Sequence, residues 1–412
     1  MLQHRKSFIF VTLTLLSLLS VILASCKSGS TESGSDNNVS VYKPRYASGF
    51  EIVGEEGKSS VILRVTSPWQ GEDTPVRELF ICRGDETVPD GFSGQVLQGD
   101  AERIVCMSST QIAMLHLVDA SDNVVGVSGI DFITDQDIQS RRADIGDVGY
   151  DGNIDYERLV SLKPDLVLLY GVSGADPMEG KLRELGIPFI YIGEYVEESP
   201  LGKAEWMVAV AETVGRRHQA EEVFRQIPEK YEALKKRVAD AGERRPKVML
   251  NMPYGDSWFM PPKDSYFVTM LEDAGADYVY RANDSKTSKP IDMEEAFMLA
   301  SGADKWLNLG SNVRTAADLG KALPKFVKTP PVAKGELYNN TERMTAAGGN
   351  DFYESGVVNP DLVLRDLIKI MHPSLVPEPF TYYRHITFRE SGAPNPEDDP
   401  ELSDLNDLPP AS

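Results

Sequence analysis

The chain has 412 residues, of which 41% are hydrophobic and 25% charged, ordinary values for a folded protein of two or three domains. Acidic residues outnumber basic ones by 63 to 42, which gives a formal net charge of −21. This balance argues against a nucleic-acid partner, because phosphate contacts need clustered Lys and Arg. The one apolar run near membrane length stands at the extreme N-terminus, which excludes an integral transporter or channel.

The first 26 residues form an export signal. Arg5 and Lys6 precede an apolar stretch over 8–24 that is interrupted only by Ser and Thr, a pattern typical of a signal peptide. The stretch ends in LASC at 23–26, which resembles the bacterial lipobox. That resemblance implies that Cys26 is lipidated and becomes the new N-terminus. Several acyl chains would then give stable anchoring to a membrane of the cell envelope, facing the periplasm or the exterior.

Three further segments flank the main body. Residues 27–40 are rich in Gly, Ser and Asn and predict a flexible tether. Residues 41–100 carry β-rich runs at 60–65 and 78–82 between turn residues, which predicts a small β-hairpin extension. Residues 390–412 are acidic and Pro-rich and predict a disordered tail. Cys82 and Cys106 lie in apolar runs. The sequence leaves two alternatives for them, a disulfide between the two or two buried free thiols.

From residue 101 onwards strands alternate with helices. Residues 101–200 and 243–389 each contain short, continuously apolar strands followed by helical segments, which predicts buried parallel sheets. Between them, 201–242 shows apolar residues at three- and four-residue steps and predicts one long helix that Gly215 and Pro228 kink or divide. The fold class is therefore α/β, with two Rossmann-like lobes joined by one long bridging helix.

The two α/β blocks share a phrase. In the first, Ile154-Asp155-Tyr156-Glu157 precedes a helix and then the strand PDLVLL at 164–169. In the second, Ile291-Asp292-Met293-Glu294 precedes a helix and then ADKWLNL at 303–309. Two similar lobes imply a cleft between them, and clefts of that kind bind small ligands.

Three motifs carry a resemblance to a known family: RIVCMSSTQIAMLHLVDASDNVVGVSG from residue 103, NIDYERLVSLKPDLVLLYG from 153, and VNPDLVLRDLIKIMHP from 358. Over 103–373 the chain resembles the substrate-binding proteins of ABC importers for iron-siderophore, haem and cobalamin. The resemblance implies a metal chelate or corrinoid as ligand, no cofactor, an ABC permease as partner, and capture without chemistry. A surface lipoprotein that captures chelates or protein partners without a permease is the alternative.

The resemblance also implies one docking Glu per lobe, at the start of the echoed helix. These positions are Glu157 and Glu294, with Glu295 leaving the second choice slightly open. A carboxylate at a helix N-terminus is also expected for stability alone, since it complements the helix dipole.

The ligand residues are expected after the carboxyl ends of the strands, where open α/β sheets bind ligands. Aromatic side chains are frequent there, and they suit a planar macrocycle or a catechol, although each ring could instead belong to the core. Lys263 and Arg281 are weaker candidates for meeting an anionic chelate. The predicted ligand-binding residues are Ser109, Thr110, Tyr170, Tyr195, Tyr254, Trp258, Phe259 and Tyr353.

Other functions find little support. His116, His218, His372 and His385 do not follow strands, so no bare-metal site is predicted, while haem ligation by a single Tyr or His stays open. A G-x-S-x-G elbow, a P-loop and an HExxH motif are absent from the sequence, which argues against an enzyme.

Overall fold

The computed structural model describes residues 38–71, 74–150 and 152–387. The predicted export signal with Cys26, residues 27–37 of the predicted tether and the predicted acidic tail lie outside these residues. Residues 38–40, predicted as the end of the tether, instead begin a β-strand. Val39 and the described residues after it belong to one compact unit. Within the described residues, no helix is long and apolar enough to cross a membrane.

The N-terminal extension is a five-stranded sheet, so the prediction of a hairpin is wrong in size. The strand order is β1-β2-β3-β4-β5, with β2–β3 and β3–β4 antiparallel and β4–β5 parallel. Alternate residues such as Ile52, Leu63 and Leu79 are fully buried in the main core. The strands are β1 (Asn38–Tyr42), β2 (Phe50–Glu55), β3 (Val61–Val65), β4 (Arg77–Cys82) and β5 (Gln95–Gln98).

The N-terminal lobe is built on a parallel sheet of order β12-β11-β6-β7-β8. A capping box of Ser108 and Gln111 starts its first helix. The sheet strands are β6 (Ile104–Cys106), β7 (Val124–Val127), β8 (Gly146–Asp147), β11 (Leu166–Leu169) and β12 (Phe189–Tyr191), and β9 (Gly149–Tyr150) pairs with β10 (Asn153–Ile154). The helices are α2 (Ser109–His116), η1 (Ser121–Asn123), η2 (Ile130–Phe132), α3 (Gln136–Ser140), α4 (Tyr156–Ser161), α5 (Met178–Leu185) and η3 (Glu194–Val196).

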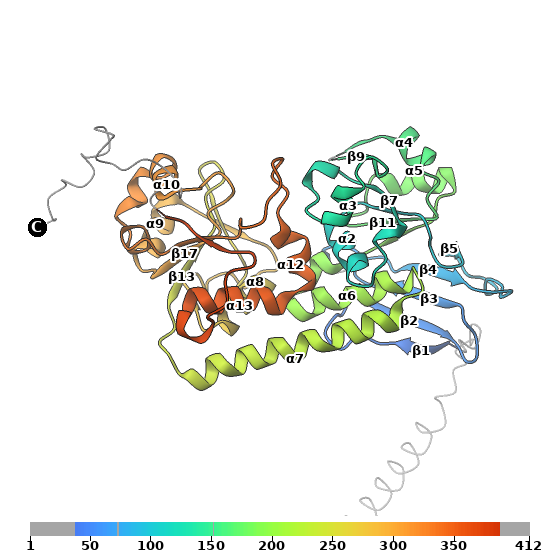
Figure 1. Cartoon of the computed structure of the whole chain (residues 1–412), viewed down its shortest axis with the longest axis horizontal. Coiled ribbons are helices and arrows are strands. Elements are labelled where there is room, and N and C mark those ends of the chain that lie inside the picture. The colour runs from blue at the N-terminus through green and yellow to red at the C-terminus, as the bar shows by residue number, and fades with distance from the viewer. Residues whose placement is uncertain (1–37, 72–73, 151, 388–412) are drawn as a thin grey trace, which may run out of the picture. The chain divides into compact units, whose positions relative to one another are not determined.

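The segment between the lobes forms two helices that lie side by side, α6 (Pro200–Glu212) and α7 (Arg217–Ala241) (Figure 1). The chain divides at Gly215, which adopts a φ of 68°, as the sequence suggests. Pro228 lies inside α7 without ending it. The bridge itself is α7: Gln219 near its start bonds Asp119 of the N-terminal lobe, and Tyr231 further along bonds Asp273 of the C-terminal lobe, each at 2.9 Å.

The C-terminal lobe has a second sheet of order β15-β13-β17-β18-β19. Its last pair, β18 with β19, is antiparallel. Pro360 opens the final long helix, and Asn359 does not cap it, because its side-chain amide donates to Ser355 O instead. The strands are β13 (Lys247–Leu250), β14 (Trp258–Met260), β15 (Asp277–Tyr278), β16 (Lys289–Ile291), β17 (Lys305–Leu307), β18 (Leu337–Asn339) and β19 (Arg384–His385). The helices are α8 (Tyr266–Asp273), α9 (Met293–Ser301), α10 (Ala316–Ala322), η4 (Pro324–Lys328), α11 (Pro330–Ala333), η5 (Asp351–Tyr353), α12 (Ser355–Val358), α13 (Pro360–Met371) and η6 (Pro373–Leu375).

The repeated phrase has the same structure in both lobes. Asp155 and Asp292 cap α4 and α9, and each follows a short antiparallel strand. The second Asp of each phrase binds the chain at the start of the neighbouring strand. Asp165 accepts hydrogen bonds from the Glu102 and Arg103 amides, and Asp304 accepts one from the Lys247 amide.

Both cysteines of the body are buried free thiols. Burial alone raises the pKa of the Cys106 thiol. The alternative of a disulfide between Cys82 and Cys106 is not realised in this structure.

Candidate ligand-binding site

Five of the predicted aromatic side chains are exposed. Tyr170 and Tyr195 follow β11 and β12 of the N-terminal lobe, and Tyr254, Phe259 and Tyr353 belong to the C-terminal lobe. Tyr254 is the extreme case, with 84% of its surface exposed. Large rings left in water at the carboxyl ends of strands are the expected feature of an apolar ligand site.

Trp258 does not belong with them. Its side chain has no exposed surface, and its indole N–H donates to Leu250 O at 2.9 Å. The ring packs against Trp306 and Phe326 at centroid distances of 5.5 Å. Trp258 is therefore a core residue in this structure, and its prediction as a ligand contact is wrong.

The two hydroxyl candidates at the start of α2 differ. Thr110 is buried, and its hydroxyl donates to Glu194 Oε1 at 2.6 Å. That hydroxyl therefore already has a partner, and its main contact is with the protein. Ser109 is half-buried at the first position of the same helix.

A buried lysine, Lys203, lies close to two tyrosine rings. The Lys203 ammonium donates to the backbone oxygens of Glu194 at 2.6 Å and Tyr195 at 3.2 Å. It also lies 5.7 Å from the ring centroid of Tyr195 and 4.8 Å from that of Tyr266. Burial lowers the pKa of Lys203 to about 8, while the carboxylates of Glu194 and Glu197 oppose that shift.

Tyr266 of α8 has tyrosine side chains of both lobes among the groups that shift its pKa. Burial raises its pKa, and the hydroxyls of Tyr353 and Tyr195 raise it further. One of these neighbours comes from each lobe, so phenol groups from both lobes lie near Tyr266. The sequence could have pointed to Lys203, because it stands with Glu205 in the mainly apolar stretch PLGKAEWMVAVA, where each charge needs a specific partner.

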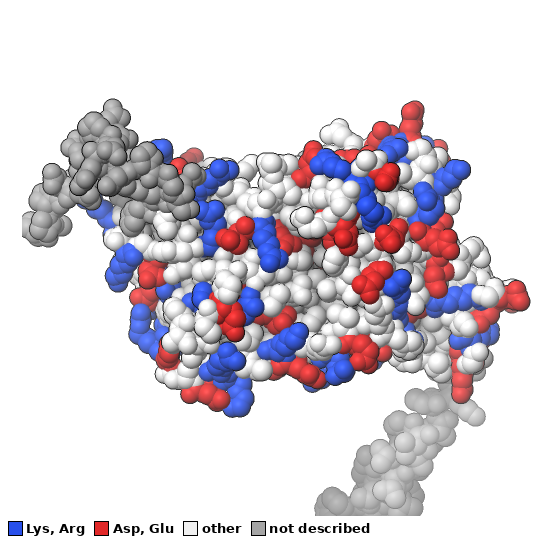
Figure 2. Space-filling view, in the orientation of Figure 1, with Lys and Arg blue, Asp and Glu red and all other residues white. Residues whose placement is uncertain are grey.

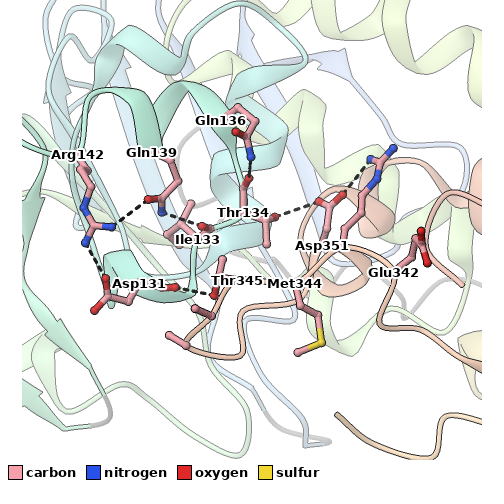
Figure 3. Close-up of a pocket in the computed structure, with 13 residues that line it drawn as sticks. Asp131, Ile133, Thr134, Gln136, Gln139, Arg142, Glu342, Met344, Thr345 and Asp351 are labelled. Atoms are coloured by element: carbon pink, nitrogen blue, oxygen red, sulfur yellow. Dashed lines mark hydrogen bonds and ion pairs between the residues drawn. The ribbon is translucent and has the colours of Figure 1, made fainter. Parts of the chain in front are cut away.

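A hairpin of the C-terminal lobe contacts the N-terminal lobe. We call residues 343–351 the finger; it is closed by a bridge between Met344 and Asn350. The Thr345 hydroxyl donates to Asp131 O at 2.7 Å, and the Thr134 hydroxyl donates to Asp351 Oδ1 at 3.1 Å (Figure 3). The finger therefore joins the lobes directly.

A pocket of about 940 Å³ lies between the finger and the N-terminal lobe (Figure 3). Most of its lining residues are polar or charged, among them Thr134, Gln136, Gln139, Arg142 and Arg343, and the rest include Ile133 and Met344. None of the eight predicted ligand residues lines it. The structure thus shows a polar pocket at one edge of the lobe boundary and exposed aromatic rings elsewhere at the strand ends.

The basic side chains near these features are already paired. Arg142 lies 2.6 Å from Asp131, and Arg343 lies 3.2 Å from Asp351. Of the weaker candidates, Lys263 pairs with Asp284, and Arg281 pairs with Glu272 at 2.7 Å. Acidic and basic residues are interspersed over the face shown in Figure 2.

The two docking candidates occupy matched positions. Glu157 and Glu294 are each the second residue of a helix, and both are exposed. Glu295 is exposed as well. Among the described residues, no ion pair involves any of the three. An apolar residue is exposed one turn later in each helix, Val160 in α4 and Met298 in α9.

His116 lies in a small polar group at the end of α2. Its Nδ1 is 2.9 Å from Asp135 and 3.5 Å from Asp137. The three side chains could hold an ion, but Asp135 also caps α3 through Ile138 N. His372 is buried and bonds Glu243 at 2.9 Å, as a structural residue does.

Comparison with known proteins decides the family. The model of the family described as "Periplasmic binding protein" matches residues 104–336, more than half of the chain. The chain belongs to this family. The resemblance seen in the sequence is thus confirmed, and membership makes the chain a binding protein and not an enzyme.

Relatives and structures agree with the family. An uncharacterized lipoprotein of Methanocaldococcus jannaschii, MJ0878, is 23% identical over 80% of this chain and 81% of its own length. A periplasmic haem-binding protein from Pseudomonas aeruginosa superposes with a TM-score of 0.55 at 17% identity, covering 71% of this chain and all of that one. A periplasmic binding protein from Veillonella parvula gives 0.54 at 17% identity, over 77% and 99%. These structures share the fold, which confirms the two-lobed α/β class.

Proposed function

We propose that this protein is the solute-binding component of an ABC importer. It captures a metal chelate of the iron-siderophore, haem or cobalamin type between its lobes and delivers the chelate to a permease. Membership in the periplasmic binding protein family is the observation that carries this proposal. The structural relative from Pseudomonas aeruginosa is described as a haem-binding protein, which supports this class of ligand.

The exposed rings support a ligand with a broad apolar surface. Tyr195 from one lobe and Tyr353 from the other are 49% and 53% exposed, and both raise the pKa of Tyr266. A macrocycle or catechol placed between the lobes would bury these rings, and burial of aromatic area is a main source of affinity.

We also propose that Cys26 anchors the protein in the cell envelope. The tetrapeptide LASC at 23–26 and the naming of the relative MJ0878 as a lipoprotein support the anchor. Mass spectrometry of the mature protein tests it: the expected N-terminal peptide starts at a diacylated or triacylated Cys26, and an unmodified Cys26 would contradict the anchor.

The ligand class can be tested with purified mature protein. We expect haemin, a cobalamin or a ferric catecholate to change the absorption spectrum and raise the melting temperature, since a ligand at 100 times its Kd adds about 2.7 kcal/mol. Tyr195→Ala and Tyr353→Ala should each weaken the ligand that binds by roughly tenfold, which is about 1.4 kcal/mol. Val327→Ala, which removes an exposed apolar group outside the site, is the control. Failure of all three classes to bind would exclude a chelate function.

Docking is tested separately from binding. Glu157→Ala and Glu294→Ala should abolish uptake by cells while leaving the affinity for the ligand unchanged. Glu184→Ala, an exposed carboxylate on α5, controls for the lost charge. Normal uptake by the double variant would refute the docking assignment and leave the capture function standing.

A further inference from the structure

The contact between the finger and the N-terminal lobe is unusually close. A Cβ on Gly349 would lie 1.9 Å from Phe132 O, so the two backbones touch without room for a side chain. Gly349 itself is buried, and its φ lies outside the left-handed region. Glycine is therefore required there for the approach between the lobes rather than for the finger's own conformation.

Glu354 lies at the base of the finger and takes part in the same contact. Its Oε2 accepts a hydrogen bond from Thr134 N of the N-terminal lobe at 2.8 Å, and the residue is 2% exposed. In the part of the chain that the structure describes, no cation pairs with this carboxyl. A buried carboxyl without a cation favours its neutral form.

The groups around Glu354 are mostly acidic. Burial raises the pKa of Glu354 to about 7, the Thr134 hydrogen bonds lower it, and Asp351 and Asp135 raise it again. The basic groups nearby are committed elsewhere: Arg343 pairs with Asp351, and His116 of α2 with Asp135. Of the other helices packed on α12, α6 supplies Lys203, which bonds the Glu194 and Tyr195 oxygens, and α13 supplies Asp361.

We propose that the finger and Glu354 form a proton-sensitive clasp on residues 131–134, which is docked when Glu354 is protonated and released when Glu354 ionises. The released finger opens the edge of the lobe boundary where the polar pocket lies. Because α12 also packs against α2 and α6, release moves the finger rather than a whole lobe. The clasp is a property of the protein itself and does not depend on the identity of the ligand.

The direction of the pH effect follows from linkage. With the finger released, water reaches Glu354 and its pKa returns towards 4.5. The docked form then binds the proton more tightly, so it is favoured in acid and weakens as the pH rises through about 7. Between pH 5.5 and 8.5, the ratio of docked to released protein should fall on the order of thirtyfold.

Spin labels on the mature protein can measure this ratio. One label replaces Ala347 at the finger tip and the other replaces Glu184 on α5; both positions are exposed, and the native Cys82 and Cys106 are buried. We expect a single distance population at pH 5.5 and a second population, from the released finger, at pH 8.5. An identical distance distribution at both pH values would overturn the proposal.

Two variants distinguish the effect of Glu354 ionisation from that of the close contact at Gly349. Glu354→Gln keeps the size and the acceptor oxygen but cannot ionise, so it should stay docked at both pH values. Gly349→Ala should be released at both, because its methyl group collides with Phe132 O. Glu342→Gln, an exposed carboxylate beside the finger, should behave as the unmodified protein. A Glu354→Gln protein that still opens at pH 8.5 would also refute the clasp.

Discussion

Glu205 holds the N-terminal extension onto the helix between the lobes. Its carboxylate accepts hydrogen bonds from the Tyr42 hydroxyl at 2.7 Å and from the amides of Arg45, Tyr46 and Ala47 at 2.7–2.8 Å. The residue is 1% exposed. Four donors around one buried carboxylate make up for its lost hydration, so the extension is an integral part of the fold rather than an appendage.

Removing this carboxylate should therefore cost much stability. Glu205→Ala leaves three buried or half-buried amides without an acceptor, and we expect a loss of about 3–5 kcal/mol. Urea unfolding measures it. Glu222→Ala, on the exposed face of α7, should stay within about 0.5 kcal/mol. Equal stabilities for the two variants would contradict the structural role of Glu205.

Lys203 gives a pH-dependent prediction. Its pKa falls from 10.5 to about 8 in the folded protein because of burial, so the unfolded chain binds the proton more tightly. Stability should then rise as the pH increases between about 8 and 10.5. Relative to Lys203→Met, the unmodified protein should gain about 2 kcal/mol between pH 7 and 9.5 in urea unfolding. Lys236→Met, on the solvent side of α7, should show no such difference from the unmodified protein. If the free energy of unfolding depends on pH in the same way for Lys203→Met and Lys236→Met, the lowered pKa of Lys203 is refuted.

The sequence could place aromatic residues near the strand ends but could not sort exposed from buried ones. Trp258, Phe259 and Met260 form β14, where the side chains alternate as buried, exposed and buried. Phe259 thus stayed in water while Trp258 entered the core. Period-two alternation in a short strand was the available signal, but its phase depends on contacts with Trp306 and Phe326, which are distant in sequence.

At the scale of elements, the turn between α6 and α7 is set by one glycine. Gly215 has a φ of 68°, and a Cβ there would lie 2.4 Å from Asp100 Oδ2. Gly242, after α7, has a φ of 60° with nothing within 4 Å of its would-be Cβ. The two positions share the backbone conformation and differ only in available space.

This matched pair predicts two different costs. Gly242→Ala should lose about 1–2 kcal/mol, the price of a left-handed non-glycine residue. Gly215→Ala should lose clearly more, because the methyl group must also displace Asp100, which pairs with Arg83 at 2.7 Å. Thermal or urea unfolding of both variants measures the difference. Equal losses of unfolding free energy in the two variants would show that the Asp100 side chain moves aside without destabilising the protein.

Elements with strong periodicity were predictable, whereas pairings between distant segments were not. The α/β alternation and the division of the connecting segment at Gly215 could be predicted, because glycine turns and apolar spacing are local signals. The extension was underestimated because β4 and β5 pair in parallel across an intervening loop. The finger escaped prediction because its structure consists of contacts with another lobe.

At the scale of the molecule, α7 decides how far the lobes can move. It is a continuous helix of 25 residues, bonded to the N-terminal lobe near its start through Gln219 and to the C-terminal lobe further along, through Tyr231 and Arg237. A helix is stiff over such a length, and the two lobes are not joined by the crossing strands of a hinge. Motion should therefore be confined to local elements such as the finger.

Solution scattering can test this stiffness. With whichever chelate binds, the radius of gyration of the free and liganded protein should agree within error, because α7 fixes the separation of the lobes. A triglycine insertion after Lys236, on the exposed side of α7, should weaken the helix, since each internal Gly costs about 1 kcal/mol, and should permit a measurable compaction on binding. A large compaction in the unmodified protein would instead show a hinge that α7 does not restrain.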